Sequence, residues 1–405
     1  MFYWRRARAM GRRRVCALNS PDIQLFSERD RRFIEPSLRR CPRQGRTSLV
    51  LLLALVVASL GGAPSALAAE GSGLLSALSP GSVGAGSGVA RMVVSPDGRS
   101  AYAANRFTTT VSQYARNPET GALTPLSPAS VEAGYSPEGI AISPDGKDVY
   151  VANRYSNTLS EFSRNSETGK LTALSKATVP AGEGPIGMTI SADGKSVYAA
   201  NSSSATVSEY SRSSETGVLT PLSPATIPAG ANVHGMVVSA DGKSVYATNY
   251  NSSTVSEYSR NSETGKLTAL SPATVAAGVN PHDLAISPDG KSVYVANSTS
   301  PGKVTLFTRN TTTGALTSTA AITAGEYTEC VLVSPDGTNV YATNETTNTV
   351  SQYTRNSETG ILTALSPATV PAGADPEGIA ISPDGHNIYT TNNGANTISQ
   401  YARSH

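Results

Sequence analysis

Five ionisable side chains recur along the sequence, each seven residues before an Asp-Gly pair. They are Glu138, His234, His282, Glu329 and Glu377. An imidazole and a carboxylate that lie close together can exchange protons, because each moves the pKa of the other toward neutrality. If the fold brings these five residues to one place, we expect proton-transfer chemistry there, with these side chains as the catalytic candidates.

Two further sets of positions bring charge and polarity to the same place. The residue after this position is Arg91, Asp283 or Cys330 in three copies. A second position, at the end of a later segment, holds Arg106, Arg154 or Tyr250 in three copies. Guanidinium groups bind anionic ligands well, so we assign the arginines, Tyr250 and Asp283 to ligand binding. Cys330 is interpreted as an inert lone thiol rather than a reactive one.

Other interpretations of these positions stay open. Two histidines with a glutamate could bind a divalent metal instead. The same residues could also form a polar surface without chemistry. Our assignment names no metal and no cofactor.

The Asp-Gly pairs mark a repeated unit that must position these side chains. They begin at Asp97, Asp145, Asp193, Asp241, Asp289, Asp336 and Asp384, with spacings of 48, 48, 48, 48, 47 and 48 residues. Each unit contains short runs rich in Val, Ile, Tyr and Thr, separated by Gly, Pro, Asn and Asp, which is typical of β-strands and hairpin turns. Four short antiparallel strands in each of seven units predict an all-β, seven-bladed β-propeller.

The two ends of the repeat region predict how the ring closes. The last unit stops after its third strand, at residues 396–405, and lacks a fourth. Residues 75–86, "LSALSPGSVGAG", match the fourth-strand segment "LTALSPATVPAG" at 362–373. We therefore expect the N-terminal strand to complete the seventh blade, which removes an open sheet edge. Residues 70–405 should form one domain.

Residues that are present in every unit are expected to serve the architecture. A Tyr, an Asn and an Arg recur seven times, as Tyr102, Asn105 and Arg116 in the first unit. We interpret the Tyr as packing between blades and the Asn as a turn bond. The Arg would be a solvated charge or a charge between blades.

Residues 1–69 differ in composition from the rest and are predicted to be a basic lead plus a secretory signal peptide. Arginines precede the apolar run Leu49–Leu60, and an Ala-x-Ala site lies at residues 66–68. We expect a secreted or extracytoplasmic protein of the cell envelope, attached to a membrane only if this segment is not cleaved. Cys16 and Cys41 precede the cleavage site, so Cys330 alone would remain and no internal disulfide could form.

The charge of the repeat region excludes one class of partner. Residues 70–405 carry 19 of the 32 basic and 26 of the 30 acidic residues, a net charge of −7. A mildly acidic surface argues against sequence-independent nucleic-acid binding.

The repeat "SPDGKSVYVAN" resembles the YVTN-type repeat, and residues 75–405 resemble the seven-bladed β-propeller lactonase family, which includes 6-phosphogluconolactonases. "HGMVVSA" at 234–240 and "HDLAISP" at 282–288 match a histidine signature of that family. The resemblance implies that His234 or His282 is the catalytic histidine. It also implies a substrate-binding cation before the third strand of the histidine-bearing blade, and we assign this role to Lys303.

These observations leave two main hypotheses for function. One is an exported lactonase-like hydrolase of a sugar lactone or related sugar-acid ester, acting at the mouth of the central channel. The alternative is a non-catalytic propeller that binds a carbohydrate, a peptide or a cell-envelope component, or serves as a scaffold. In either case we expect a monomer.

Overall fold

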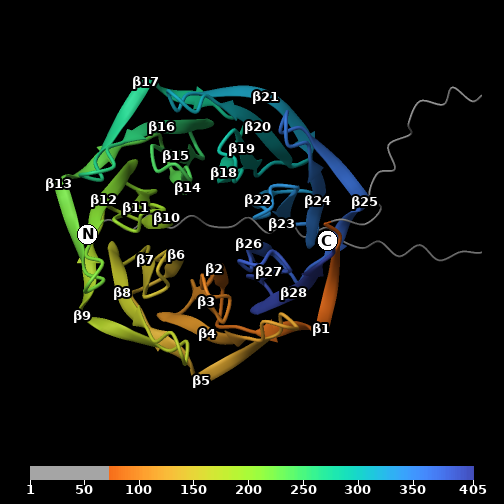
Figure 1. Cartoon of the computed structure of the whole chain (residues 1–405), viewed down its shortest axis with the longest axis horizontal. Helices are drawn as coiled ribbons and strands as arrows, with labels where there is room; N and C mark the ends of the chain where they lie inside the picture. The colour runs from red at the N-terminus through yellow and green to blue at the C-terminus, as the bar shows by residue number, and fades with distance from the viewer. Residues whose placement is uncertain (1–72) are drawn as a thin grey trace, which may run out of the picture. The chain divides into compact units, whose positions relative to one another are not determined.

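The computed structural model describes residues 73–405, and this part of the chain is a ring of seven β-sheets (Figure 1). Each sheet is a blade of four antiparallel strands, so the predicted seven-bladed propeller is confirmed. These residues contain no helix, and therefore none that is long and apolar enough to cross a membrane. The predicted signal peptide lies outside the described residues.

In six of the blades the strands follow the order of the sequence from the centre of the ring outward, and in the remaining blade β1 lies outside β26, β27 and β28 (Figure 1). The innermost strands are β2 (Val89–Val94), β6 (Pro137–Ile142), β10 (Pro185–Ile190), β14 (Val233–Val238), β18 (Pro281–Ile286), β22 (Thr328–Val333) and β26 (Pro376–Ile381). The second strands are β3 (Ser100–Asn105), β7 (Asp148–Asn153), β11 (Ser196–Asn201), β15 (Ser244–Asn249), β19 (Ser292–Asn297), β23 (Asn339–Asn344) and β27 (Asn387–Asn392).

The outer half of each blade is built in the same way. The third strands are β4 (Thr110–Arg116), β8 (Thr158–Arg164), β12 (Thr206–Arg212), β16 (Thr254–Arg260), β20 (Lys303–Arg309), β24 (Thr349–Arg355) and β28 (Thr397–Arg403). The outermost strands are β5 (Leu123–Glu132), β9 (Leu171–Pro180), β13 (Leu219–Pro228), β17 (Leu267–Ala276), β21 (Leu316–Thr323), β25 (Leu362–Pro371) and β1 (Leu75–Gly84). We number the blades 1 to 7 from β2–β5 to β26–β28 with β1.

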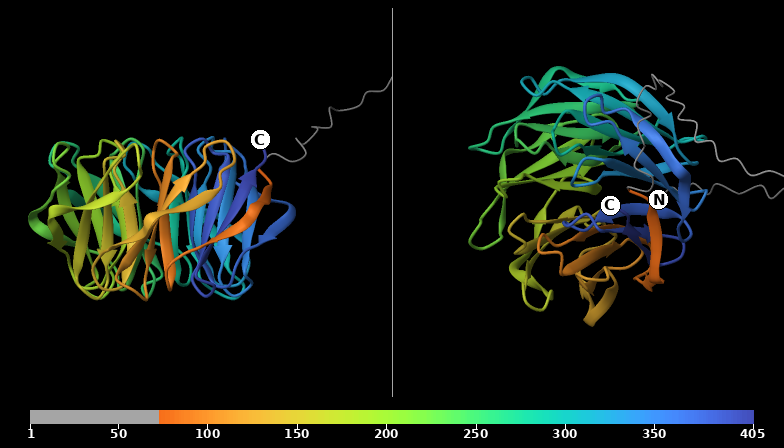
Figure 2. Two further views of the ribbon diagram at one scale, coloured as in Figure 1. Left: turned by 90° about the horizontal axis from the view of Figure 1, so that it is seen from below. Right: turned by 45° about the vertical axis from the view of Figure 1, so that its right-hand side comes forward.

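The N-terminal strand closes the ring, as expected. β1 pairs antiparallel with β28, from Leu75 opposite Arg403 to Gly84 opposite Thr397. β1 therefore lies at the outside of blade 7, beside strands from the far end of the chain (Figures 1 and 2). No blade of the described ring lacks its fourth strand.

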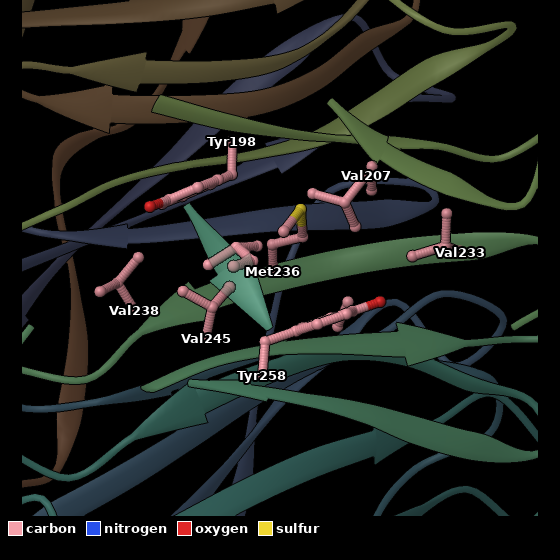
Figure 3. Packing of buried hydrophobic residues seen from close by; sticks show 10 residues of the cluster. Tyr198, Val207, Val233, Met236, Val238, Val245 and Tyr258 are labelled. Atoms are coloured by element: carbon pink, nitrogen blue, oxygen red, sulfur yellow. The ribbon is translucent and has the colours of Figure 1, made fainter. Parts of the chain in front are cut away.

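Hydrophobic clusters fill the spaces between neighbouring blades. At the interface of blades 3 and 4, Tyr198 and Val207 of blade 3 pack against Val233, Met236 and Val245 of blade 4 (Figure 3). Seven such clusters are present in residues 73–405. The alternation of apolar residues along each strand therefore serves packing between sheets, which is the main favourable term in folding.

The repeated arginine joins each blade to the one before it. Arg164, at the end of β8, contacts Asp97 in the Asp-Gly turn of blade 1 at 2.7 Å, and its Nε donates to the Tyr102 hydroxyl at 3.0 Å. Burial opposes ionisation of Asp97, but bonds from Ser95, the Arg99 amide and Arg164 hold the pKa of its carboxyl below the usual value. The seven pairs are Arg116–Asp384, Arg164–Asp97, Arg212–Asp145, Arg260–Asp193, Arg309–Asp241, Arg355–Asp289 and Arg403–Asp336. Of the two roles considered for this arginine, the charge between blades is the one observed.

A second inter-blade bond varies in chemistry from blade to blade. In blade 1, Gln113 accepts a bond from the Leu171 amide of blade 2 and donates one to the Pro128 carbonyl. Blades 2, 3 and 4 have Glu161, Glu209 and Glu257 at this position. Each glutamate accepts the equivalent amide bond, but a carboxylate cannot donate the second one. Burial raises the pKa of all three carboxyl groups.

Replacing Glu161, Glu209 and Glu257 together by Gln should stabilise the protein near neutral pH, by about 1 kcal/mol per site, because Gln restores the missing donor. Since the folded-state pKa of each glutamate lies above its unfolded value, its stabilising contribution is present in acid and is lost as the pH rises through the folded-state pKa. The gain in Tm should therefore be larger at pH 8 than at pH 4.

Thermal unfolding from pH 4 to 8 measures this difference. The matched control replaces the exposed turn residues Glu167, Glu215 and Glu263 by Gln, which should leave Tm nearly unchanged. A triple variant that is no more stable than the native sequence at pH 8 would show that the buried carboxylates are already satisfied.

Candidate active site

A cavity of about 160 Å³ lies at the mouth of the central channel and gathers most of the residues expected there. Eight predicted residues line it: Arg91, Arg106, Glu138, Arg154, His234, His282, Glu329 and Glu377. Tyr250 lies beside the two histidines, and Asp283 lies one level deeper. Lys303, at the start of β20, is exposed and is not part of the lining.

The cavity also includes residues to which the sequence analysis gave no role. Asp375, Glu345 and Asn393 line it beside Glu377. Glu345 and Asn393 occupy the same repeat position as Arg106, Arg154 and Tyr250. This equivalence could have predicted that they line the cavity. Asp375 stands two places before Glu377, at a repeat position that holds Gly, Ser, Asn or Tyr in the other blades, and this mixture did not point to a site.

Irregular backbone at the start of each inner strand directs these side chains into the mouth. A residue with positive φ stands two places before the lining residue, for example Asn232 (φ 56°) before His234 and Asp375 (φ 51°) before Glu377. The pairing with the second strand then shifts register, between Val233 and Met236 in β14. A β-bulge of this kind re-aims a side chain without breaking the sheet.

His282 is held as a cation. Its Nδ1 lies 2.9 Å from the Glu329 carbonyl oxygen, and its Nε2 lies 3.0 Å from Glu329 Oε2. Both nitrogens face acceptors, so both must carry hydrogen. Burial alone would lower the pKa of His282, but the charge of Glu329 outweighs it and raises that pKa above 6.5. The Ser298 hydroxyl donates to the other carboxylate oxygen of Glu329 at 2.8 Å and fixes the pair.

His234 is the neutral partner of this pair. Its ring lies 4.5 Å from the ring of His282, centroid to centroid. Burial, and then the positive charges of His282 and of the nearby arginines, hold the pKa of His234 well below 6.5. Its Nε2 lies 3.2 Å from Asn232 Oδ1, an acceptor, so this nitrogen carries the proton and Nδ1 keeps its lone pair. The ring of Tyr250 covers both histidines, at 5.4 and 6.0 Å.

The opposite wall of the cavity is a chain of ion pairs. Glu138 Oε1 lies 3.0 Å from Arg106 Nε and 3.0 Å from Arg154 Nη1. Arg106 also contacts Glu377, which accepts a bond from Asn393 at 3.2 Å. The side chain of Arg154 is 37% exposed against 25% for Arg106, so Arg154 is the guanidinium more open to an entering anion.

Arg91 forms the floor of the cavity and reaches across the channel. It starts on β2 of blade 1, and its Nη1 lies 3.3 Å from Asp283 of blade 5 and 3.3 Å from the sulfur of Cys330 in blade 6. A second cavity of about 160 Å³ lies deeper in the channel beyond Arg91, and its lining combines Arg91, Asp283 and three glycines with six apolar side chains. Cys330 is buried, and burial raises the pKa of its thiol well above the usual value. Its surroundings fit an unreactive thiol.

Three threonines support the backbone of the site. Thr248 accepts a bond from the Gly235 amide and donates one to the His282 carbonyl, both at 2.8 Å. Thr343 joins Cys330 to Glu377 in the same way, and Thr391 joins Gly378 to Ala90. The other four blades have Ala at this position: Ala104, Ala152, Ala200 and Ala296. The sequence analysis missed these residues, although the alternation of Ala and Thr at one repeat position could have indicated them.

The residues that could hold a metal are arranged for other bonds. His282 and Glu329 are bonded to each other, and Glu138 and Glu377 to arginines. Within residues 73–405, no three His, Cys, Asp or Glu side chains converge as a set of metal ligands.

Comparison with known proteins identifies the family. The model of a family described as lactonase, 7-bladed beta-propeller, matches residues 67–234, 224–333 and 331–405. The chain belongs to this lactonase family. The resemblance inferred from the repeats is therefore confirmed. No curated protein matches the chain.

Solved structures of this lactonase propeller's neighbours cover most of its length. A putative 6-phosphogluconolactonase of Bacteroides uniformis is 26% identical, with a TM-score of 0.66, over 77% of this chain and 91% of that one. The periplasmic gluconolactonase of Pseudomonas aeruginosa is 20% identical, with a TM-score of 0.60, over 71% and 86% of the two chains. Hydrazine synthase of Kuenenia stuttgartiensis is 19% identical, with a TM-score of 0.61, over 78% and 96%. The last two show the fold alone, and they differ in chemistry, so function must be argued from the cavity.

The two cavity histidines should titrate on opposite sides of pH 6.5, His282 above and His234 below. Glu329→Gln should lower the pKa of His282 by about one unit or more, because it removes the adjacent negative charge. The chain has four histidines, so a proton NMR titration resolves them once single substitutions assign the signals.

The control for this titration is Glu358→Gln. Glu358 lies in the exposed turn between β24 and β25, the two outer strands of blade 6. It should move neither pKa. A His282 signal that titrates below that of His234 would contradict the charge assignment.

Proposed function

We propose that the mouth cavity hydrolyses a lactone of a sugar acid, with His234 as the general base. The observation that carries this proposal is the pairing of a neutral imidazole, His234, with a cationic one, His282, 4.5 Å away in the same cavity. Hydrolysis of a lactone needs a base for water and positive charge near the carbonyl oxygen, and these two rings supply both.

The reaction would proceed in two steps. The lone pair of His234 Nδ1 takes a proton from water as the water oxygen bonds to the lactone carbonyl carbon. The negative charge that develops on the carbonyl oxygen is stabilised by the cations around it, His282 and Arg91. The ring C–O bond then breaks, and His234 returns its proton to the departing ring oxygen, which gives the open-chain hydroxy acid.

The roles of the two predicted histidines therefore separate. His282 is a poor base, because both of its nitrogens already carry hydrogen and face Glu329. It acts as a fixed charge that also keeps the pKa of His234 low. Glu329 holds that charge in place, so it is a positioning residue.

The polar lining favours a hydroxylated substrate. The cavity offers carboxylate and guanidinium groups and one aliphatic residue, Ile186. Arg154, the more exposed guanidinium, would bind a carboxylate or phosphate on the sugar acid. The B. uniformis neighbour, a putative 6-phosphogluconolactonase, supports testing a phosphorylated lactone beside a neutral one.

A second function, binding without turnover, is favoured by a different observation. Glu138, Arg106 and Glu377 are held in ion pairs with one another, and structural ion-pair networks of this kind also occur at sites without catalysis. In this case the propeller would hold a carbohydrate or cell-envelope component at the same mouth.

We also propose that the protein is exported from the cytoplasm. This proposal rests on the apolar run Leu49–Leu60 and the Ala-x-Ala site at residues 66–68. A cleaved segment of this kind would place the substrate outside the cytoplasm. We propose a monomer that meets this substrate in the cell envelope or outside it.

Turnover of glucono-δ-lactone and 6-phosphoglucono-δ-lactone, corrected for spontaneous hydrolysis, tests the proposal. His234→Asn should lower kcat by roughly 10²- to 10⁴-fold, the usual contribution of a general base. The pH profile of kcat/KM should be bell-shaped. It rises below pH 6.5 as His234 loses its proton, and falls above pH 6.5 as His282 loses its charge.

His386, at the Asp-Gly turn of blade 7, provides the control, because it lies outside the cavity. His386→Asn should leave kcat and the pH profile unchanged. Ligand binding with no turnover of either lactone would favour the binding function instead, and full activity of His234→Asn would remove His234 from the mechanism.

A further inference from the structure

Three large aromatic side chains are exposed in the loops that join the strands of blades 1 and 2. Tyr135 is 63% exposed, Tyr155 66% and Phe107 68%. In the other blades, the position of Tyr135 holds Ser87, Glu183, Ala231, Val279, Glu326 and Ala374. The position of Tyr155 holds Ser203, Asn251, Thr299, Thr346 and Gly394, and Phe107 in blade 1. The repeat therefore does not require an aromatic residue at either place.

Tyr135 and Tyr155 lie together as a pair of rings. Their centroids are 6.2 Å apart, and the ring planes are tilted by 39°. The Tyr155 amide donates to the Tyr135 carbonyl at 3.2 Å, which holds the two loops side by side. We call these two rings the tyrosine shelf. Because both side chains are largely exposed, they contribute little to the core, so packing does not explain them.

The shelf is continuous with the mouth cavity through Arg154. The guanidinium carbon of Arg154 lies 5.6 Å from the centre of the Tyr155 ring. The same guanidinium is 3.0 Å from Glu138, which lines the cavity. A ligand that fills the cavity and extends toward blade 2 would therefore meet Arg154 first and then the two rings.

We propose that the tyrosine shelf is a subsite for a second sugar ring, so that the substrate is the lactone of a disaccharide acid. This inference rests on the proposed lactonase function. The lactone ring would occupy the mouth cavity, and the attached pyranose would lie on Tyr155 and Tyr135. The face of a pyranose presents C–H groups, which pack on an aromatic ring, while its hydroxyls reach polar groups at the edge.

Other occupants fit the shelf less well. A fatty acyl chain would have to lie against the ion pair of Arg154 and Glu138, which borders the shelf and offers it no apolar contact. Two exposed rings are also far smaller than a protein–protein interface, which buries about 800 Å² on each partner. A sugar ring needs an area of about one or two aromatic side chains and tolerates charges beside it.

Kinetics with one-ring and two-ring lactones test the subsite. Cellobiono-δ-lactone and maltobiono-δ-lactone are compared with glucono-δ-lactone, using the full chain. We expect kcat/KM to be about tenfold higher for at least one two-ring lactone. In the Tyr135→Ala/Tyr155→Ala double variant, this ratio should fall to about one. In the Tyr135→Phe/Tyr155→Phe variant it should be retained, because the rings remain.

Tyr327→Ala is the matched control, since Tyr327 is an exposed aromatic residue of the loop before β22, on the other side of the ring. It should keep the native ratio. A ratio of about one in the native protein, or a high ratio that survives loss of both rings, would overturn the subsite while leaving the lactonase function in place.

Binding of the open-chain acids separates failure of the subsite from failure of the proposed function. Isothermal titration calorimetry compares gluconate with cellobionate and maltobionate. Tighter binding of a disaccharide acid that is lost in the Ala double variant supports the subsite, even if neither lactone is turned over. Equal binding of all three acids, or no binding of any, overturns it.

Discussion

The buried arginine at the end of each third strand is the contact on which the ring depends. It bonds to the turn aspartate and the tyrosine hydroxyl of the preceding blade, so each sheet is placed by its neighbour. The same contact spans the junction of the two chain ends, where Arg116 of blade 1 meets Asp384 of blade 7. Because a buried guanidinium must be fully paired, this contact fixes the angle between blades as well as their distance.

Because these contacts hold the ring, the residues that line the mouth can differ from blade to blade. The seven lining positions are equivalent in backbone, yet they hold histidine, glutamate, isoleucine or alanine. The bulge and the left-handed residue before each position aim the side chain whatever its chemistry. In blades 4, 6 and 7 a threonine replaces alanine on the second strand and bonds the backbone of the next blade, at His282, Glu377 and Ala90. Local differences thus build a site on a nearly uniform scaffold.

The fold was predictable because a strict period allows each residue to be placed by its copies. That reasoning located most of the cavity, since Glu138, His234 and Glu377 share one repeat position. It failed for Lys303, which was chosen by family resemblance. The loop before Lys303, "STSPG", is one residue longer than its equivalents, since Asn297 pairs with Lys303 where Asn249 pairs with Thr254, and the side chain is exposed.

The different charge states of His234 and His282 could not be predicted from the sequence, for a physical reason. His234 and His282 occupy equivalent positions and follow similar residues, so a pattern gives them the same role. They differ because the carbonyl and the carboxylate of Glu329 both face the ring of His282, whereas the acceptor bonded to His234 is the uncharged amide of Asn232. Such differences depend on which side chains the neighbouring blade brings to the ring, and a single repeat unit does not contain that information.

The pairing of β1 with β28 has a consequence for synthesis. β1 leaves the ribosome first among the strands, whereas its partners β26–β28 leave last, more than 300 residues later. Six blades can be complete while the seventh is still missing, and during that time both flanks of the nascent arc are uncovered. The final strands therefore close the ring, which reaches its finished form only after translation of the whole repeat array has ended.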